Sequence, residues 1–249
     1  MNHLLPPHPL DELLTPERAA TYRAVLARRT RRLVVVIEDC HDPHNATAVV
    51  RTADAFGLQE VHVTTARSAF KVNPKVSQGS HLHVDLHVHQ SIDAAYAALR
   101  ARGYRIVVSD LKAGATVGPQ QLRGDLERQP LALVFGSESD GVSPAASAAA
   151  DGFFLIPMVG FPQSLNLSVS VATSVYALRG EALSAGGGGD LSMDDQRALY
   201  EMWVRRQRGE AADIVMKRAI GRSGEELDVF GGESGSPEVR TSGSPESLI

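Results

Sequence analysis

The segment 153–178 limits the possible fold more than any other part of the chain. Its sequence is FFLIPMVGFPQSLNLSVSVATSVYAL. An apolar run typical of a buried strand ends at Ile156 and Pro157, and the loop that follows is apolar where loops are usually polar. We expect a loop between two buried elements to be buried too, so its backbone N–H and C=O groups need partners. A bound small molecule would supply them, and the loop therefore predicts a binding site.

Apolar runs of strand length alternate with helical patterns along most of the chain. Strands are predicted at 33–37, 61–65, 104–109, 131–135 and 153–156. Helices are predicted at 15–29, 45–56, 91–102 and 143–150. The first of these helices begins with a capping Thr15 followed by Pro16. The alternation predicts an α/β fold, a parallel sheet with helices on both faces.

The stretch from His81 to His89 alternates polar and apolar residues, which predicts one more strand. The histidines share one face, and the leucines and valines share the other. Imidazole is a common metal ligand, so this row of histidines raises the question of a metal site. Neighbours on one face of a strand lie roughly 6–7 Å apart, so one strand does not easily surround an ion. We therefore expect no metal site here.

The two ends of the chain differ in composition from its centre. Residues 1–30 and 190–222 are predicted to form helical extensions, and the second contains a sequence close to a capping box at Ser192. Residues 223–249 hold six acidic residues and one arginine among many Gly, Ser and Pro residues, which predicts a disordered acidic tail. The central domain then spans 31–183.

The net charge of −4 is unevenly distributed. Because the tail is strongly acidic, residues 1–222 carry a slight positive charge, and six arginines lie within 1–32. Clustered bases of this kind are compatible with binding to RNA phosphates.

Composition also limits the compartment. The chain has no uncharged apolar run of about 18 residues, so no membrane span or membrane partner is predicted. The N-terminus lacks a basic region followed by an apolar stretch, so no secretory signal is expected. The single Cys40 excludes an internal disulfide framework and suits a reducing compartment. We expect a cytoplasmic protein.

Three segments match, in order, the motifs of a known family. They are 37–63 (IEDCHDPHNATAVVRTADAFGLQEVHV), 133–143 (LVFGSESDGVS) and the 153–178 segment. Together they resemble the motifs of the SPOUT superfamily, in its SpoU/TrmH branch of RNA ribose 2′-O-methyltransferases. The sequence GSHLH at 79–83 and the two extensions are similar to those of the branch's tRNA-modifying members.

The resemblance bears on residues 165–173, whose pattern is ambiguous. The sequence LNLSVSVAT alternates and is rich in β-branched residues, which favours a strand. The family has a helix here. We predict a helix, because Ser164 is suited to cap one and small residues let a helix pack closely.

The resemblance also implies the architecture and the methyl donor. It implies a C-terminal trefoil knot, and a homodimer in which each active site draws on both subunits. The donor would be S-adenosylmethionine, held by backbone groups at four positions: Ser109, Gly136, Ile156 and Leu165. Gly136 suits this role physically, because a residue without Cβ lets a ligand approach the backbone.

Five residues match the family's catalytic positions: Asn45, Arg51, Glu138, Ser164 and Asn166. Arginine is a poor general base, so we expect Arg51 to anchor a phosphate and stabilise the developing alkoxide. Glu138 would orient Asn45 or Arg51. Ser164 and Asn166 would hold the ribose or a phosphate at a helix N-terminus.

The resemblance predicts an enzyme that methylates the ribose 2′-oxygen of a guanosine in the tRNA D loop. No metal should be required, because the donor already carries an activated methyl group. Two alternatives remain: ribosomal RNA or another tRNA position as substrate, and a non-catalytic RNA-binding module with the same fold. A plain nucleotide-binding domain is less consistent with the sequence, because GSESDG is not a dinucleotide-binding glycine motif and no phosphate-loop lysine follows.

Overall fold

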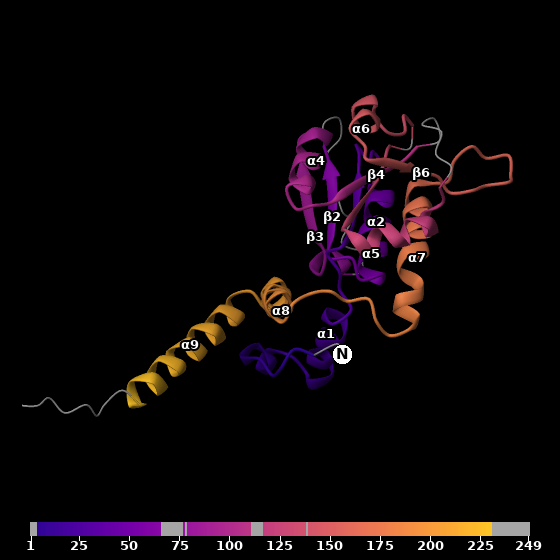
Figure 1. The fold of residues 1–249 in the computed structure, drawn as a ribbon. Helices are drawn as coiled ribbons and strands as arrows, with labels where there is room; N and C mark the ends of the chain where they lie inside the picture. Colours follow the sequence, from indigo (N-terminus) through magenta and orange to yellow (C-terminus); the bar gives the residue numbers. More distant parts are fainter. Residues whose placement is uncertain (1–3, 66–76, 78, 111–116, 138, 231–249) are drawn as a thin grey trace, which may run out of the picture.

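The computed structural model describes residues 4–65, 77, 79–110, 117–137 and 139–230. Its centre is a sheet of six parallel strands in the order β3-β2-β1-β5-β4-β6 (Figure 1). The strands are β1 (Leu33–Ile37), β2 (Glu60–Thr64), β3 (Asp85–His89), β4 (Arg105–Ser109), β5 (Leu131–Phe135) and β6 (Gly152–Phe154). The predicted parallel α/β sheet is confirmed.

One face of the sheet is covered by α2 (Pro43–Ala55), α5 (Arg123–Arg128), the short helix η3 (Pro119–Leu122) and α7 (Leu167–Ser184). Val35 of β1 and Leu133 of β5 face these helices and are fully buried. Val49 of α2 and Val171 of α7 belong to the same apolar cluster. This face therefore joins the helix after β1 to the helix after β6.

The opposite face is covered by α4 (Ile92–Arg100) and α6 (Pro144–Ala148). Val34, Val36 and Val134 point into this second layer, where they meet Tyr96 and Ala146 of the two helices. Because β1 and β5 are buried on both faces, their sequences are continuous apolar runs instead of alternating ones.

Helix starts follow the capping residues that the sequence offers. The side chains of Thr15, Asp42, Ser91, Ser143 and Ser192 each accept a backbone N–H in the first turn of α1 (Pro16–Leu26), α2, α4, α6 and α8 (Met193–Arg208). Helix α2 ends where Gly57 adopts a φ of 73°, a conformation that costs glycine little. Among the described residues, no helix combines the length and apolar character needed to cross a membrane.

The histidine-rich stretch differs from its prediction in two ways. Only Asp85–His89 forms a strand, and residues 80–82 form a 3-10 turn, η2 (Ser80–Leu82). The polar face is also the more buried one: Leu86 and Val88 are 40% and 59% exposed, whereas His87 and His89 are half-buried. Strand β3 is at the edge of the sheet, and its polar face lies against α4 and the side chains of β2. Alternation predicted the strand but not which face would be covered.

The first and last helices pack on each other below the sheet (Figure 1). The short helix η1 (Pro9–Leu13), α1, α8 and α9 (Glu210–Phe230) contribute Leu10, Tyr22, Trp203 and Val215 to this third cluster. Helix α9 extends past position 222 and projects away from the body, while residues 231–249 lie outside the described part.

Arg29 connects this helical cluster to the α/β core. Its side chain is fully buried, donates to the Leu58 carbonyl oxygen at 2.9 Å and pairs with Asp54. Its guanidinium also lies 5.1 Å from the centre of the Trp203 ring. Arg31 is likewise engaged, with Glu60 at 3.1 Å and Asp195 at 2.7 Å. Arginines of the basic segment that suggested an RNA-binding surface therefore form contacts with other residues of the protein.

Replacing Arg29 should destabilise the fold. Arg29→Met leaves the half-buried Asp54 carboxylate and the Leu58 carbonyl without their partner. The free energy of unfolding should fall by about 3 kcal/mol, the lower end of the range for breaking a buried ion pair, because Asp54 retains some contact with water. Arg28→Met is the matched control, because Arg28 is exposed and its loss should cost less than about 0.5 kcal/mol. Denaturant titration of both variants measures the difference, and equal small losses would contradict the role of Arg29.

Candidate active site

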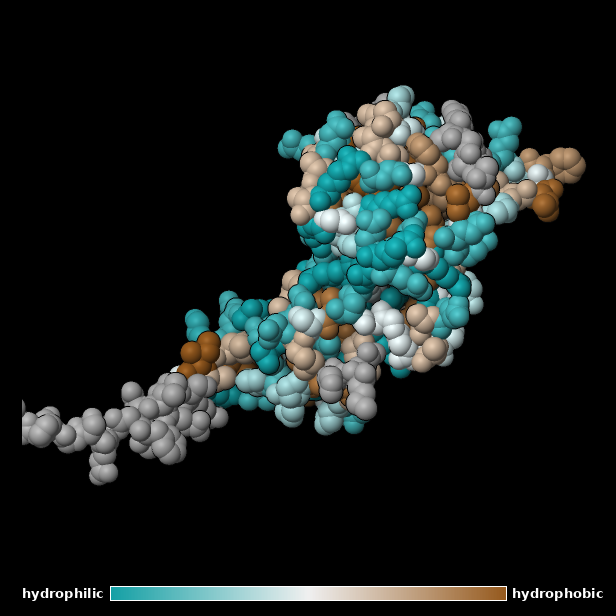
Figure 2. Space-filling model, in the orientation of Figure 1, coloured by the Kyte–Doolittle hydropathy of each residue, from teal (hydrophilic) through white to brown (hydrophobic). Residues whose placement is uncertain are grey.

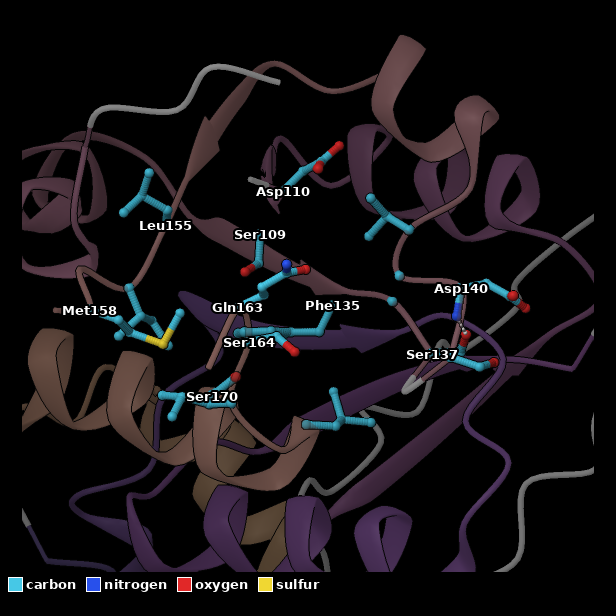
Figure 3. A pocket seen from close by; sticks show the side chains of 17 residues that line it. Ser109, Asp110, Phe135, Ser137, Asp140, Leu155, Met158, Gln163, Ser164 and Ser170 are labelled. Atoms are coloured by element: carbon cyan, nitrogen blue, oxygen red, sulfur yellow. Dashed lines mark hydrogen bonds between the residues drawn. The ribbon is translucent and has the colours of Figure 1, made fainter. Parts of the chain in front are cut away.

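A cavity of about 350 Å³ opens at the carboxyl ends of β4, β5 and β6 (Figure 3). Ligands of open α/β sheets bind at this edge, outside the carboxyl ends of the strands. The lining residues come from the ends of the three strands, the loop after each of them and the first turns of α7: Ser109, Asp110, Phe135, Gly136, Ser137, Ser139, Asp140, Gly141, Val142, Leu155, Ile156, Met158, Gln163, Ser164, Leu165, Leu167 and Ser170.

All four residues at which the resemblance places the methyl donor line this cavity: Ser109, Gly136, Ile156 and Leu165. Ser164 lines it as well. These residues are spread over 57 positions of sequence, and the sheet brings them together because β4, β5 and β6 are parallel and end at the same edge.

The loop after β5 explains why position 136 is a glycine. The backbones of Ser137 and Gly141 exchange two hydrogen bonds, at 3.0 and 3.1 Å, and so turn the loop back on itself. A Cβ on Gly136 would lie 1.9 Å from the carbonyl carbon of Gly141. Glycine at position 136 is therefore needed for more than the approach of a ligand. The loop that forms one wall of the cavity cannot close around a larger residue.

Glu38 and Tyr96 hold the far end of this loop. The buried carboxylate of Glu38, just after β1, accepts the Ser143 N–H at 2.8 Å. The Tyr96 hydroxyl of α4 donates to the Ala146 carbonyl oxygen at 3.2 Å. Burial raises the pKa of Tyr96, and the nearby Glu38 charge raises it further, so the hydroxyl stays protonated and remains a donor. The wall of the cavity is therefore fixed to two other elements of the core.

The apolar loop of 157–163 is not buried as a whole, contrary to the expectation from its composition. Val159 and Phe161 at its centre are fully exposed, at 107% and 105%. Its flanks do face the cavity, through Ile156 and Met158 on one side and Gln163 on the other. The residues at the two ends of the loop thus lie at the predicted binding site, whereas the residues at its centre present apolar side chains to solvent.

Asn166 joins two of the three motifs. The predicted helix is present as α7, but it begins at Leu167, and its N-cap is Asn166 instead of Ser164. The Asn166 side-chain oxygen accepts the Ser168 N–H at 2.9 Å, and its amide nitrogen donates to the Asn45 side-chain oxygen at 3.0 Å. Asn45 is buried in the first turn of α2. One amide therefore caps α7 and fastens it to α2.

Arg51 and Glu138 are not part of the described wall of the cavity. Arg51 is exposed on α2, and six residues separate it from the buried Asn45, so the two side chains lie on different sides of that helix. Glu138 lies outside the described residues. The structure therefore brings Asn45 to Asn166 but does not bring Arg51 into the cavity of its own chain.

Sequence inspection missed several residues of the cavity. Asp110 follows β4 directly and accepts a hydrogen bond from the Ser147 hydroxyl at 3.0 Å. Gln163 and Ser170 also line the cavity. The small size of Ser170 was a usable signal, since a larger residue on the first turns of α7 would fill the space.

Comparison with known proteins identifies the family of the chain. The sequence profile of the SpoU rRNA Methylase family matches residues 32–176, a span that contains the sheet, α2, the cavity and half of α7. The chain belongs to the SpoU methylase family.

Several members of the SpoU methylase family are similar over most of their length. The tRNA (guanosine(18)-2′-O)-methyltransferase of Thermus thermophilus is 37% identical over 172 residues, 69% of this chain and 87% of the relative. The enzyme of the same name from Escherichia coli K12 is 35% identical over 211 residues, 85% of this chain and 89% of the relative. The crystal structure of an A. aeolicus TrmH/SpoU tRNA modifying enzyme superposes with a TM-score of 0.69 at 29% identity, over 77% of this chain and 97% of that one.

The close fit around Gly136 leads to a stability prediction. Gly136→Ala should lower the free energy of unfolding by about 1–3 kcal/mol, because the new methyl group overlaps the Gly141 backbone. Gly124→Ala is the control: it lies in α5, where a Cβ would meet only Arg128 Nη1 at an ordinary 3.7 Å, and alanine favours a helix over glycine. Thermal unfolding of the two variants compares them. An unchanged unfolding temperature of the Gly136→Ala protein would show that the loop can move to accommodate a Cβ at this position.

Proposed function

We propose that this protein transfers a methyl group from S-adenosylmethionine to the ribose 2′-oxygen of a guanosine in the tRNA D loop, position 18 in the names of its relatives. The observation that carries the proposal is the cavity, which is lined by all four residues expected to hold the donor. The names of two relatives at 35% and 37% identity support the choice of RNA and nucleotide.

The cavity suits a nucleoside-containing donor. Its volume of 350 Å³ lies within the usual range for small-molecule sites, about 300–1,000 Å³. Ile156, Met158 and Leu165 offer apolar surface, while Ser109 and Gln163 offer polar groups. The donor, when bound, supplies an activated methyl group. The protein then has to hold the ribose hydroxyl in line with that group and accommodate the departing proton.

The N-terminus of α7 is suited to bind the ribose or the phosphate of the RNA substrate. Ser164 lines the cavity, and Asn166 is fixed at the N-terminus of an 18-residue helix. The partial positive charge of a helix N-terminus favours a phosphate or a developing oxyanion. We assign Ser164 and Asn166 to positioning the ribose or its phosphate, Asn45 to holding Asn166, and Glu138 to orienting Asn45 or Arg51.

We further propose a homodimer in which Arg51 acts in the cavity of the partner subunit. Arg51 is exposed and does not line the described cavity of its own chain, which favours a contribution to the cavity of a second copy. A surface for that copy exists. Val159 and Phe161 of the loop before α7 are fully exposed, and Val169 and Tyr176 of α7 are 47% and 61% exposed. Figure 2 shows apolar residues gathered on this projecting loop, and an exposed apolar patch of this kind indicates a contact site.

The trefoil knot of the superfamily belongs to the same proposal. The loops after β5 and β6 both return to line the cavity, and α7 then packs on α2. Threading of the C-terminal segment through one of these loops would bring the two loops together around the donor.

The assigned activity has a direct test. Purified protein is incubated with labelled S-adenosylmethionine and either total tRNA or ribosomal RNA, and the methylated nucleotide is mapped. We expect label in tRNA at the D-loop guanosine, and none in a matched tRNA with adenosine at that position. Label in ribosomal RNA would support the alternative substrate. Donor binding without methylation of any RNA would support a non-catalytic module.

Arg51→Ala should affect turnover more than donor binding. Loss of a group that stabilises charge on the 2′-oxygen should reduce turnover roughly 100-fold, as for one oxyanion donor. Arg51→Lys should recover little, because an ammonium group lacks the planar fork that bridges an alkoxide and a phosphate. Arg128→Ala provides the control, since Arg128 ends α5 away from the cavity and pairs only with Asp125 among the described residues. Melting curves and donor titrations accompany the rates. Normal turnover in folded Arg51→Ala would remove Arg51 from the mechanism.

Mixed dimers separate the two possible locations of Arg51. One chain carries Arg51→Ala, and the other carries Ser109→Tyr, which fills the cavity. If Arg51 acts in the partner's cavity, the mixed dimer contains one complete site and should regain about half of the wild-type activity, although each homodimer retains only a small fraction of it. Differently tagged chains, co-expressed and purified through both tags, provide the sample. An inactive mixed dimer would place Arg51 in its own chain's site.

A further inference from the structure

A cluster of histidines and one carboxylate lies on the two outer strands, away from the cavity. Glu60 and His62 belong to β2, and His87 and His89 belong to β3. The parallel register places His62 directly beside His87, with ring centres 4.6 Å apart. None of the four residues lines the cavity, so the methyl-transfer site does not account for them.

Three side-chain atoms of this cluster converge. Glu60 Oε2 lies 3.4 Å from His62 Nε2 and 3.6 Å from His87 Nε2. Each of the three side chains offers one ligand atom within 4.8 Å of those of the other two. A tetrahedral zinc ion with bonds of about 2.0–2.1 Å separates its ligand atoms by about 3.3 Å. The cluster therefore comes close to the spacing of three zinc ligands without movement of the backbone.

The His87 Nε2 atom has no hydrogen-bond partner among the described residues, although the Glu60 carboxylate lies nearby. The atom is buried, yet it makes no hydrogen bond with any group in the described part of the chain. Buried polar atoms are nearly always hydrogen-bonded, and an exception is explained by strain, a bound ion or a function. A metal ion between the three atoms would satisfy this nitrogen.

Neighbouring side chains orient His62 and Glu60, as the hydrogen-bond partners of metal ligands do. His62 Nδ1 lies 2.9 Å from His89 Nε2, with the two rings only 8° from parallel planes. If Nε2 of His62 binds a metal, its Nδ1–H donates to His89, which fixes the tautomer and the ring orientation. Glu60 is held in place by Arg102 at 2.7 and 2.9 Å and by Arg31 at 3.1 Å.

We propose that Glu60, His62 and His87 form a binding site for a divalent transition metal of the zinc class. Two imidazoles and one carboxylate suit zinc, cobalt or nickel better than magnesium or calcium, which prefer oxygen ligands. A water molecule would complete the tetrahedron on the side of His87, whose side chain is partly exposed. The ion would fasten the edge strand β3 to β2.

The site has features that weaken binding. Arg102 and Arg31 repel a cation, so the affinity should be lower than that of a closed cysteine-rich zinc site. The His62 and His87 rings lie within 17° of parallel, so both lone pairs point at one ion only after a ring rotates. His87 is partly exposed and has room for this rotation. The earlier expectation against a metal assumed that one strand supplied every ligand, whereas here β2 supplies two.

Cobalt(II) is the probe, because tetrahedral cobalt absorbs in the visible range where the protein does not. The full-length protein, freed of any affinity tag and treated with a chelator, is titrated with cobalt(II) and then with zinc(II). We expect a saturable visible band at one cobalt per chain, lost again when zinc displaces it. Zinc should also raise the melting temperature. No metal-dependent change in either readout would overturn the proposal.

Three variants assign the signal to the cluster. His87→Ala should abolish the band, and His87→Gln, which keeps a polar side chain at the edge, should do the same. His89→Ala should weaken cobalt binding by about 10–100-fold, the usual effect of losing an outer-shell partner. His44→Ala is the control, because His44 is exposed on α2 and its loss should leave the titration unchanged. A band that survives in folded His87→Ala and His87→Gln proteins would place the ion elsewhere and refute the site.

Discussion

The in-register pairing of β1 with β5 is the constraint on which the rest of the structure depends. Leu33 pairs with Leu131 and Ile37 with Phe135, so the two central strands end at the same level. The residues that follow them, Glu38 and Gly136, therefore start their loops side by side at the carboxyl edge. Glu38 can then hold the end of the loop that begins at Gly136. A shift of one residue would turn every buried side chain to the other layer and separate these loops.

The strands and most helix starts could be predicted from the sequence, because they depend on local properties. Apolar runs set β1 and β5, and capping residues set the starts of α1 and α8. Burial of the polar face of β3 could not be predicted, since it depends on which strand and helix lie beside it. The exposed centre of the 157–163 loop was missed for the same reason: composition does not reveal whether another surface covers a segment.

The candidate site was predictable only in part. Residues 109, 136, 156 and 165 were recognised by resemblance, and their meeting in one cavity depends on strand order, which spacing along the chain does not determine. Charge was a poorer guide. Arg29 and Arg31 looked like a phosphate-binding surface, but Asp54, Glu60 and Asp195 engage them within the fold. An arginine contributes to a phosphate-binding surface only when it is not already paired with a carboxylate of the protein.

The hydrogen bonds of Asn166 fix the direction of an amide that is otherwise free to rotate by half a turn. Its oxygen must face the N–H groups of α7, so its nitrogen must face Asn45. Because that nitrogen can only donate, Asn45 must present its oxygen and turn its own nitrogen away. The orientation of the α7 N–H groups thus sets the orientation of the Asn166 amide, which in turn sets that of the Asn45 amide on α2. The direction of one helix thereby determines which hydrogen-bonding group of another motif faces outward from the pair.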